Sequence, residues 1–376
     1  MKRSHILLVL GLLVLSCMLA FLVREHFSEP NAKPVVTYYF RISDDLDYKA
    51  PSQDLMNVMD EMATVANLKK ADAYFKTNFL LYETLNFVDQ IMLATKYPKD
   101  IKYIYGLRGS DMMASKSNLA MVLRTKYPDS HIDMIPNTFI LENNIDIAKL
   151  LKEYNANYVY ITKKNVQRQE GNVLTRDLES MIAHSEDTVV AQEVLMNPYL
   201  VNDRKINLRV YMLIMIDEKN NPKFFMYGNG FIYYTPKEWA YGTNPDTVIT
   251  TGYIDRDVYV ANPMTFDELE VYMDRKGDNY KTLMNNTIQL MTRITEAYTP
   301  ILVEMNKTIP GIKFLVYGCD IAPDTSLKVK IMEINKGPDL SYKDERDMKV
   351  KKLMMEEVFE IVGLVPRKRS LFYPLN

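Results

Sequence analysis

The chain has 376 residues, which is enough for one large domain or two to three small ones with a well-buried core. Charged residues make up 25% and the formal net charge is -2, so the composition excludes a strongly basic nucleic-acid-binding protein. Of the two cysteines only Cys319 lies outside an N-terminal apolar run, and the four histidines lack the spacing of a zinc site.

Residues 6–23 form this uncharged apolar run. As a helix the run would be about 27 Å long, close to the thickness of the hydrocarbon core of a bilayer. We therefore predict a single-pass membrane anchor over residues 1–24. The alternative is a cleaved signal peptide, but residues 21–23 extend the apolar run past any small-residue cleavage site. Basic residues such as Lys2 and Arg24 flank both ends, so charge leaves the orientation open.

Hydrophobic periodicity and turn residues predict the elements that follow. Residues 25–50 read as a linker with a first strand, and residues 51–155 as an N-terminal and central α/β region. The predicted elements are helices at 53–95 and 115–127, strands at 101–105, 158–162 and 188–195, and a loop at 106–109.

Two hairpins dominate the second half of the chain. Polar turns separate the predicted strands 204–216 and 223–234, and likewise the strands 313–321 and 327–334. Helices are predicted at 281–303 and at 343–362, the second with a buried stripe of Met348, Leu353, Met354, Val358 and Ile361. This order of elements predicts an α+β fold with mostly antiparallel sheets and flanking helices.

The last hairpin carries a possible metal site. Glu333 and Asn335 share one strand face because side chains alternate, and the turn places Asp320 opposite Glu333. Two carboxylates and an amide oxygen suit Mg²⁺, which prefers hard oxygen ligands together with phosphate oxygens. The other interpretation is a solvated hairpin edge with ordinary charges.

Two further patterns point to a phosphate-bearing ligand. Lys205, Asn207 and Arg209 share one face of a strand whose apolar continuation makes it central, so these polar groups need a partner. Lys163 closes another strand, where an ammonium can reach a nucleotide phosphate. The flexible stretch 167–172 after it has a single glycine, so it is a weak phosphate-loop signal.

In order, these motifs resemble the tubulin-tyrosine ligase-like family over residues 100–340. The matching segments are Leu107-Arg108-Gly109 with Ser115-Lys116-Ser117-Asn118-Leu119, Pro136-Asn137-Thr138-Phe139, Tyr160-Ile161-Thr162-Lys163-Lys164, Val189-Val190-Ala191-Gln192-Glu193-Val194-Leu195, Arg204-Lys205-Ile206-Asn207-Leu208-Arg209, Gly318-Cys319-Asp320 and Met332-Glu333-Ile334-Asn335.

The resemblance implies an ATP-grasp fold with its catalytic region at 156–365, followed by a basic C-terminal tail at 366–376. ATP and Mg²⁺ are the implied cofactors. The implied roles are phosphate contacts for Lys116 and Lys163, adenine contacts for Gln192 and the backbone near Leu195, nucleotide contacts for Lys205 and Asn207, Mg²⁺ ligation by Asp320, Glu333 and Asn335, and catalysis by Arg209, Lys205 and Thr251.

Three positions depart from the family pattern. Asn207 stands where the family has Asp, Tyr233 aligns with an Arg, and residues 249–252 keep only Thr251 of a His-Leu-Thr-Asn motif. In the family these positions handle nucleotide and amino acid. The departures leave open which amino acid is used and whether tubulin is the acceptor.

The resemblance therefore implies an ATP-dependent carboxylate–amine ligase that adds a free amino acid to a protein or peptide carboxylate through an acylphosphate. The alternatives are an inactive nucleotide-binding membrane scaffold and an ATP-grasp ligase for a small metabolite. ATP chemistry and the unpaired Cys319 favour a membrane-anchored protein with a cytosolic catalytic domain. Two glycosylation triplets, at Asn285 and Asn306, would be used only in a lumenal domain.

Overall fold

The computed structural model describes residues 36–40, 52–71, 77–85, 101–164, 171–183 and 188–375. From Thr37 onward these residues belong to one structural unit. The predicted anchor at 1–24 lies outside the described residues, as does the stretch 165–170 that covers most of the predicted phosphate loop. No helix of the described part is long and apolar enough to cross a bilayer.

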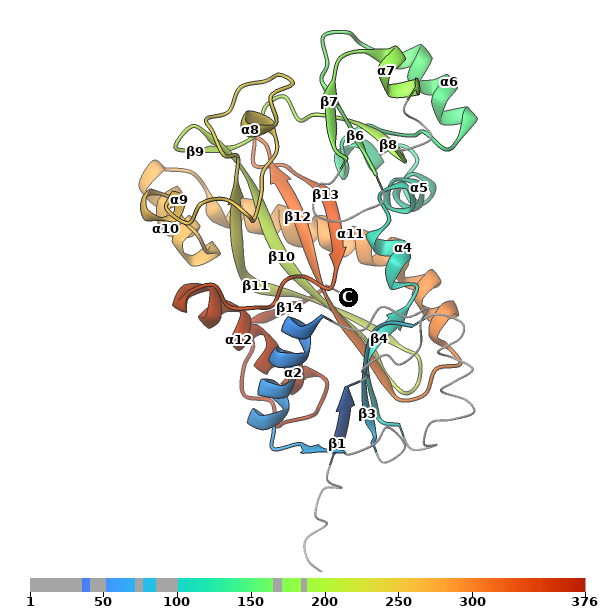
Figure 1. Cartoon of the computed structure of the whole chain (residues 1–376), viewed down its shortest axis with the longest axis vertical. Helices are drawn as coiled ribbons and strands as arrows, with labels where there is room; N and C mark the ends of the chain where they lie inside the picture. The colour runs from blue at the N-terminus through green and yellow to red at the C-terminus, as the bar shows by residue number, and fades with distance from the viewer. Residues whose placement is uncertain are drawn as a thin grey trace, which may run out of the picture. The chain divides into compact units, whose positions relative to one another are not determined.

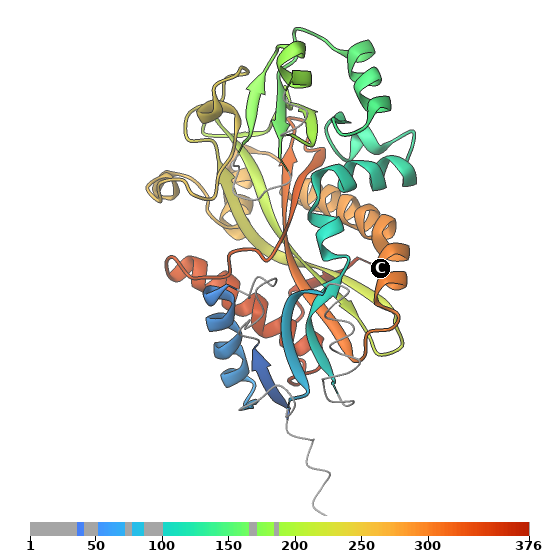
Figure 2. The same ribbon diagram turned by 45° about the vertical axis from the view of Figure 1, so that its right-hand side comes forward.

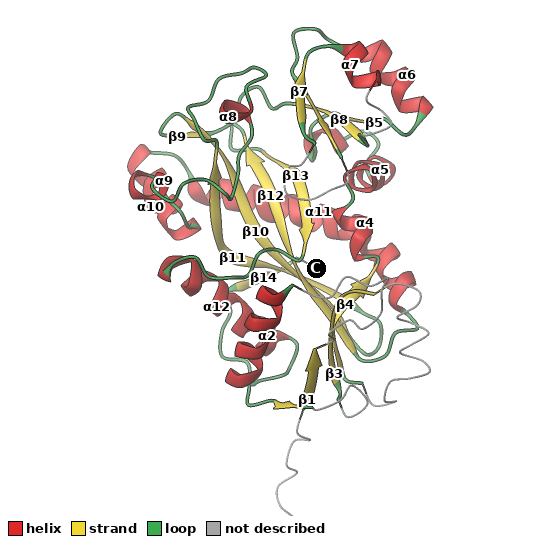
Figure 3. Cartoon of the chain, in the orientation of Figure 1, coloured by secondary structure: helices red, strands yellow, loops and turns green. Residues whose placement is uncertain are grey.

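The described strands form two sheets (Figures 1 and 3). They are β1 Thr37–Phe40, β2 Lys69–Lys70, β3 Phe79–Leu85, β4 Tyr103–Arg108, β5 Thr138–Ile140, β6 Tyr160–Lys163, β7 Val173–Thr175, β8 Val190–Glu193, β9 Leu200–Val201, β10 Arg204–Ile216, β11 Pro222–Tyr234, β12 Ile312–Pro323, β13 Val329–Lys336 and β14 Phe372–Pro374.

Within the described ranges, the large sheet has ten strands in the order β14-β11-β10-β12-β4-β3-β1-β2, with β13 paired to β12 and β9 to β10. The strands β14, β11, β10, β12 and β13 pair antiparallel with their neighbours, and the hairpin patterns predict the β10–β11 and β12–β13 pairs among them. The strands β1 to β4 pair parallel to one another, and β4 pairs parallel to β12, which the sequence did not indicate.

The small sheet, β5-β8-β6-β7, is antiparallel and holds four strands of the described chain. Segments beside it are hydrogen-bonded to the large sheet. Ile331 of β13 donates its backbone N–H to Met134 O at 2.7 Å, and Tyr199 donates to Pro323 O of β12 at 2.9 Å. These bonds hold the small sheet near the β12–β13 hairpin.

The helices begin mostly at side-chain caps, such as Ser115 and Asp344, whose oxygens accept backbone N–H groups of the first turn. The helices are α2 Gln53–Val65, α4 Ser110–Ala114, α5 Lys116–Lys126, α6 Asn144–Glu153, α7 Leu178–Ala183, α8 Pro245–Val248, α9 Val258–Ala261, α10 Phe266–Lys276, α11 Tyr280–Asn306 and α12 Glu345–Ile361, with a 3₁₀ turn η2 at His131–Asp133.

Helices cover the large sheet. The long helix α11 contacts β4, β11 and β13 and runs alongside them in both views (Figures 1 and 2), while α12 packs on α2 and β11. The buried side of α12 differs in part from the predicted stripe. Met354 and Val358 are buried, but Met348 is 39% exposed because the stripe is completed instead by Val350, Met355 and Phe359.

Two further expectations need correction. The predicted helix at 53–95 ends at Val65, and β3 follows, because parallel pairing with β1 and β4 outweighs the local helical pattern. The predicted loop at 106–109 is largely strand, since β4 continues to Arg108. The basic segment 366–376 contains β14, which pairs with β11, and its Arg369 binds Glu356 and Glu360 on α12.

Candidate active site

Three neighbouring strands place a cation and two carboxylates in a row. Arg209 of β10 pairs with Asp320 of β12, and Asp320 pairs with Glu333 of β13. The prediction that Asp320 lies opposite Glu333 is therefore confirmed. Like charges at directly opposed positions are destabilising in a sheet, so this pair requires cations beside it.

Arg209 supplies one of these cations. Its Nε donates to Asp320 Oδ1 at 2.7 Å and its Nη2 to Oδ2 at 3.1 Å, the two-point geometry that binds a carboxylate most firmly. Burial alone disfavours its charge, but the Asp320 carboxylate outweighs burial and raises the pKa of Arg209. The pKa of Asp320 is raised because burial outweighs the opposing effect of Arg209.

Lys116 supplies a second cation from outside the sheet. It is the first residue of α5, and its Nζ lies 3.3 Å from Glu333 Oε1 with only 9% of its side chain exposed. The helix start is fixed because Ser115 Oγ accepts the N–H of Asn118. The structure thus brings together two residues that the sequence separates widely.

Lys163, at the end of β6, approaches the same carboxylates from the small sheet. Its Nζ donates to Gln192 Oε1 at 2.7 Å, and Gln192 Nε2 donates to Thr138 Oγ1 at 2.9 Å. Burial lowers the pKa of Lys163 to about 8, although Glu333 and Asp320 act to raise it. Lys163 is therefore a buried ammonium that a further anion would stabilise.

Lys205 on β10 is buried beside the small sheet's apolar side chains. Its Nζ donates to Val248 O at 3.0 Å and lies 5.6 Å from the ring centre of Trp239. Burial, with the charge of Lys163, lowers the pKa of Lys205 to about 8. Val248 packs with Val159, Ile161 and Val194 of the small sheet, so an apolar wall lies next to the cations.

The predicted metal ligands are neighbours on β12 and β13. Asn335 pairs with Gly318, and its amide lies 3.5 Å from Asp320 Oδ2. Among the described residues no three His, Cys, Asp or Glu side chains form a metal cluster, so the third ligand of this site would have to be the Asn335 amide. Two carboxylates and one amide oxygen fit Mg²⁺, which binds few protein oxygens and keeps places for phosphate and water.

The remaining predicted residues, Asn207, Leu195 and Thr251, differ in their surroundings. Asn207 lies between Lys205 and Arg209 on β10, and its Oδ1 is buried without a hydrogen-bond partner in the described chain, so a ligand donor would satisfy it. Leu195 follows β8 and is half-buried. Thr251 forms a backbone bridge to Tyr234, and its Oγ1 accepts the N–H of Tyr253 at 3.1 Å, so its hydroxyl stabilises its own turn.

Some contacts were not indicated by the sequence. Thr138 orients Gln192, and Trp239 and Val248 hold Lys205. Gly318 leaves room for Arg209: a Cβ there would lie 2.7 Å from Arg209 Nη1. The sequence carries one signal for this contact: Gly318 stands two residues before Asp320, and a glycine within a strand often marks a close approach of another group.

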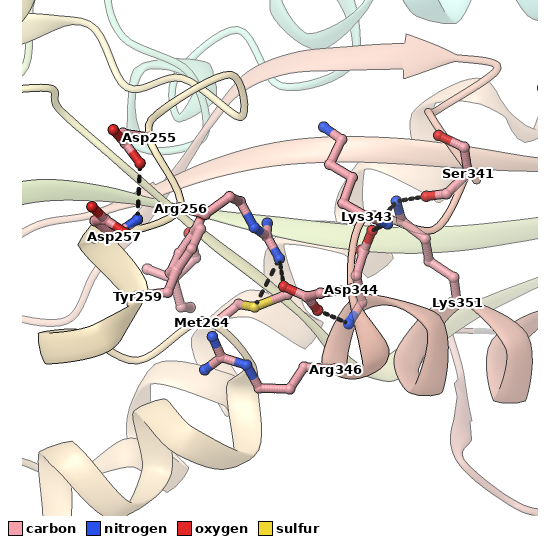
Figure 4. Close-up of polar contacts among 12 residues, drawn as sticks. Asp255, Arg256, Asp257, Tyr259, Met264, Ser341, Lys343, Asp344, Arg346 and Lys351 are labelled. Atoms are coloured by element: carbon pink, nitrogen blue, oxygen red, sulfur yellow. Dashed lines mark hydrogen bonds and ion pairs between the residues drawn. The ribbon is translucent and has the colours of Figure 1, made fainter.

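Two loops meet beside this face of the sheet. Residues 253–257 follow Thr251, and residues 337–344 follow β13. Figure 4 shows Arg256 between the carboxylate of Asp344 and the sulfur of Met264, with its guanidinium over the ring of Tyr259. The loop at 253–257 is therefore fixed to the start of α12.

Comparison with known proteins identifies the family of the chain. The sequence model of the tubulin-tyrosine ligase family matches residues 99–371. The chain is 24% identical over 200 residues to the probable tubulin polyglutamylase TTLL9 of Bos taurus, covering 48% of this chain and 40% of that protein. It is 21% identical over 263 residues to the tubulin monoglutamylase TTLL4 of Homo sapiens (65% and 22%) and 23% identical over 212 residues to the human tubulin polyglutamylase TTLL5 (50% and 16%). The chain thus spans less than half the length of each of these relatives.

Proposed function

The chain belongs to the tubulin-tyrosine ligase family, and on this premise we propose that it is an ATP-dependent carboxylate–amine ligase with an ATP-grasp fold. It adds an amino acid to a protein or peptide carboxylate through an acylphosphate. The observation that carries the proposal is the convergence of Lys116 and Lys163, from two elements outside the large sheet, on the Glu333–Asp320 pair. Cations and oxygen ligands so placed can bind a triphosphate from both sides.

The described residues divide the work as follows. Lys163, Lys116 and Lys205 neutralise phosphate oxygens, and the apolar wall near Val248 receives the base. Asp320, Glu333 and Asn335 would hold Mg²⁺, which neutralises charge on the phosphates when bound. An acceptor carboxylate oxygen bonds to the γ-phosphorus and ADP leaves. The amine nitrogen then bonds to the acyl carbon, and phosphate and a proton leave. Arg209 stabilises the anionic oxygens of both steps.

The relatives suggest the substrates to test first. Their names describe mono- and polyglutamylation of tubulin, so glutamate as the amino acid and a glutamate side chain as the acceptor are our working proposal. The full chain should transfer labelled glutamate to tubulin or to a glutamate-containing peptide only when ATP and Mg²⁺ are present. Nucleotide binding without ADP release, for every amino acid and acceptor, would instead support an inactive scaffold. The departures at Tyr233 and 249–252 are the observation that favours this second candidate.

ATP binding is expected to take up protons near pH 8. With pKa values of about 8 for Lys163 and Lys205, roughly half of each is neutral at that pH, and bound phosphates favour the ammonium form. The affinity for ATP should therefore fall as pH rises through 8. Calorimetry at pH 8 in buffers of different ionisation enthalpy measures the uptake directly. Lys163→Met should lose part of it, the exposed Lys223→Met should not, and a buffer-independent enthalpy would contradict the assignment.

The location of Asn306 bears on the compartment. Its side chain is fully buried, accepts the N–H of Arg108 at 3.1 Å and donates to the carbonyls of Arg108 at 2.9 Å and Leu302 at 2.8 Å. A glycan on its amide nitrogen would break these bonds and would not fit. We propose that the domain folds in the cytosol, where the Asn306 triplet is not modified.

Replacement of Asn306 by Ala should destabilise the protein by about 2–4 kcal/mol, because it removes the side-chain hydrogen bonds that join Arg108 of β4 to α11 and leaves a cavity at a fully buried position. The exposed Asn285→Ala, at the other triplet, should change stability by less than about 0.5 kcal/mol. Urea unfolding measures both. Mass spectrometry of the protein from its own cells should find both asparagines free of glycan, and an active protein glycosylated at Asn306 would refute the cytosolic location.

A further inference from the structure

An aromatic ring lies directly against the guanidinium of Arg209. The centre of the Tyr233 ring is 4.8 Å from Arg209 Cζ, a cation–π contact in a mostly buried setting. Tyr233 lies on β11 opposite Asn207. Two residues earlier on the same strand, Phe231 lies opposite Arg209. Burial raises the pKa of Tyr233 to about 12, so the ring stays a neutral phenol at physiological pH. It therefore adds packing beside Arg209 without adding charge.

The contact leaves one nitrogen of Arg209 available. Nε and Nη2 bind Asp320, whereas Nη1 makes no hydrogen bond within the described chain. Nη1 lies over Gly318, whose missing side chain gives it space. The bidentate pair with Asp320 and the ring of Tyr233 restrict the guanidinium in two directions, so the free Nη1 points consistently into the face that carries Glu333 and Asn335.

Gly252 lies close to the phenol end of the Tyr233 ring. A Cβ at Gly252 would lie 2.8 Å from Tyr233 Cζ, a distance that real Cβ atoms essentially never show, and 3.1 Å from its Oη. The segment is fixed at both ends: the N–H of Thr251 bonds to Tyr234 O at 3.0 Å, and Arg256 binds Asp344 (Figure 4). A chain of contacts thus runs from the start of α12 through Gly252 and Tyr233 to Arg209.

We propose that Tyr233, seated against Gly252, is a positioning residue that aims Nη1 of Arg209 at the reacting acyl and phosphoryl oxygens. The inference rests on the proposed ligase function and adds to it a residue that does not itself touch substrate. The proposal also explains why two departures from the family pattern, Tyr233 and Gly252, occur together. A Cβ at residue 252 would clash with the ring of Tyr233.

Kinetics of two substitutions test the proposal. Tyr233→Leu removes the ring and should lower kcat about tenfold while changing KM for ATP less than about twofold, because orientation of a donor and not nucleotide binding is lost. Tyr233→Phe keeps the ring and should restore kcat to within about threefold of the wild type. The matched control is Tyr127→Leu, which removes a ring 4.4 Å from Arg293 at a different location and should leave both constants unchanged. Wild-type kcat in Tyr233→Leu would overturn the inference.

A second readout does not depend on turnover. With ¹⁵N-labelled arginine, the Nε–Hε signal of Arg209, assigned by its loss in Arg209→Lys, reports guanidinium mobility. Because the two bonds to Asp320 remain in every variant, the expected result is slow rotation in the wild type and in Tyr233→Phe, and measurably faster rotation in Tyr233→Leu and Gly252→Ala. Equal mobility in all four proteins would refute the positioning role. If the wild type shows this restricted rotation but no ATP-dependent transfer, the ligase proposal fails while the structural role of Tyr233 stands.

Discussion

Glu333→Gln is expected to lower ATP-dependent amino-acid transfer by about 10³-fold, the scale of several kcal/mol of lost charge stabilisation. Glu333 is the carboxylate on which the site converges: it faces Asp320 across the hairpin, pairs with Lys116 and favours the charged form of Lys163. Glutamine keeps the shape but removes the charge, so both lysines and the proposed Mg²⁺ lose a partner. Initial rates of ADP release and of labelled amino-acid incorporation measure the effect.

The fold should survive this change, because the Glu333 side chain remains 23% exposed and glutamine can still accept a hydrogen bond from Lys116. Its thermal unfolding midpoint should stay within about 3 °C of the wild type. Glu304→Gln, at an exposed glutamate of α11 that pairs with Lys307, is the matched control and should retain full activity. If Glu333→Gln transferred amino acid at the wild-type rate, the metal and phosphate assignments would both be wrong.

Local patterns in the sequence predict the strands that frame the site. The strand at Arg204–Ile216 was predicted with its observed bounds, because its alternation and the polar turn after it are short-range features. The pairing of Asp320 with Glu333 followed in the same way, since one hairpin determines it. The face shared by Lys205, Asn207 and Arg209 required only the two-residue period of a strand.

Contacts between distant segments could not be predicted in this way. Nothing local indicates that Lys116 meets Glu333 or that Lys163 binds Gln192. The strand β3 was missed for the same reason, because parallel pairing with β1 and β4 joins segments whose own sequence also suits a helix. The resemblance to a family, and not periodicity, brought these residues into one proposed site.

The buried pair of Arg209 and Asp320 leads to a second large effect, on stability. Asp320→Ala should destabilise the protein by about 3 kcal/mol, because it leaves the largely buried guanidinium of Arg209, whose side chain is 12% exposed, without its counterion. The double variant Arg209→Met, Asp320→Leu replaces both charges by apolar groups of similar size. Its free energy of unfolding should lie within about 1–2 kcal/mol of the wild type. Urea unfolding of Arg209→Met, of Asp320→Leu and of the double variant measures the coupling, and Asp320→Ala is measured beside them.

In these variants of Arg209 and Asp320, stability and activity should change independently. The double variant should fold and yet transfer no amino acid, because it lacks both the guanidinium that we propose faces the acyl oxygens and one of the proposed metal ligands. Such a result would mean that the pair is kept for chemistry, since an apolar pair supports the sheet nearly as well. If the double variant were as unstable as Asp320→Ala, the pair would instead be a structural requirement of β10 and β12. The role of Arg209 in catalysis would then rest on the kinetics of Tyr233 alone.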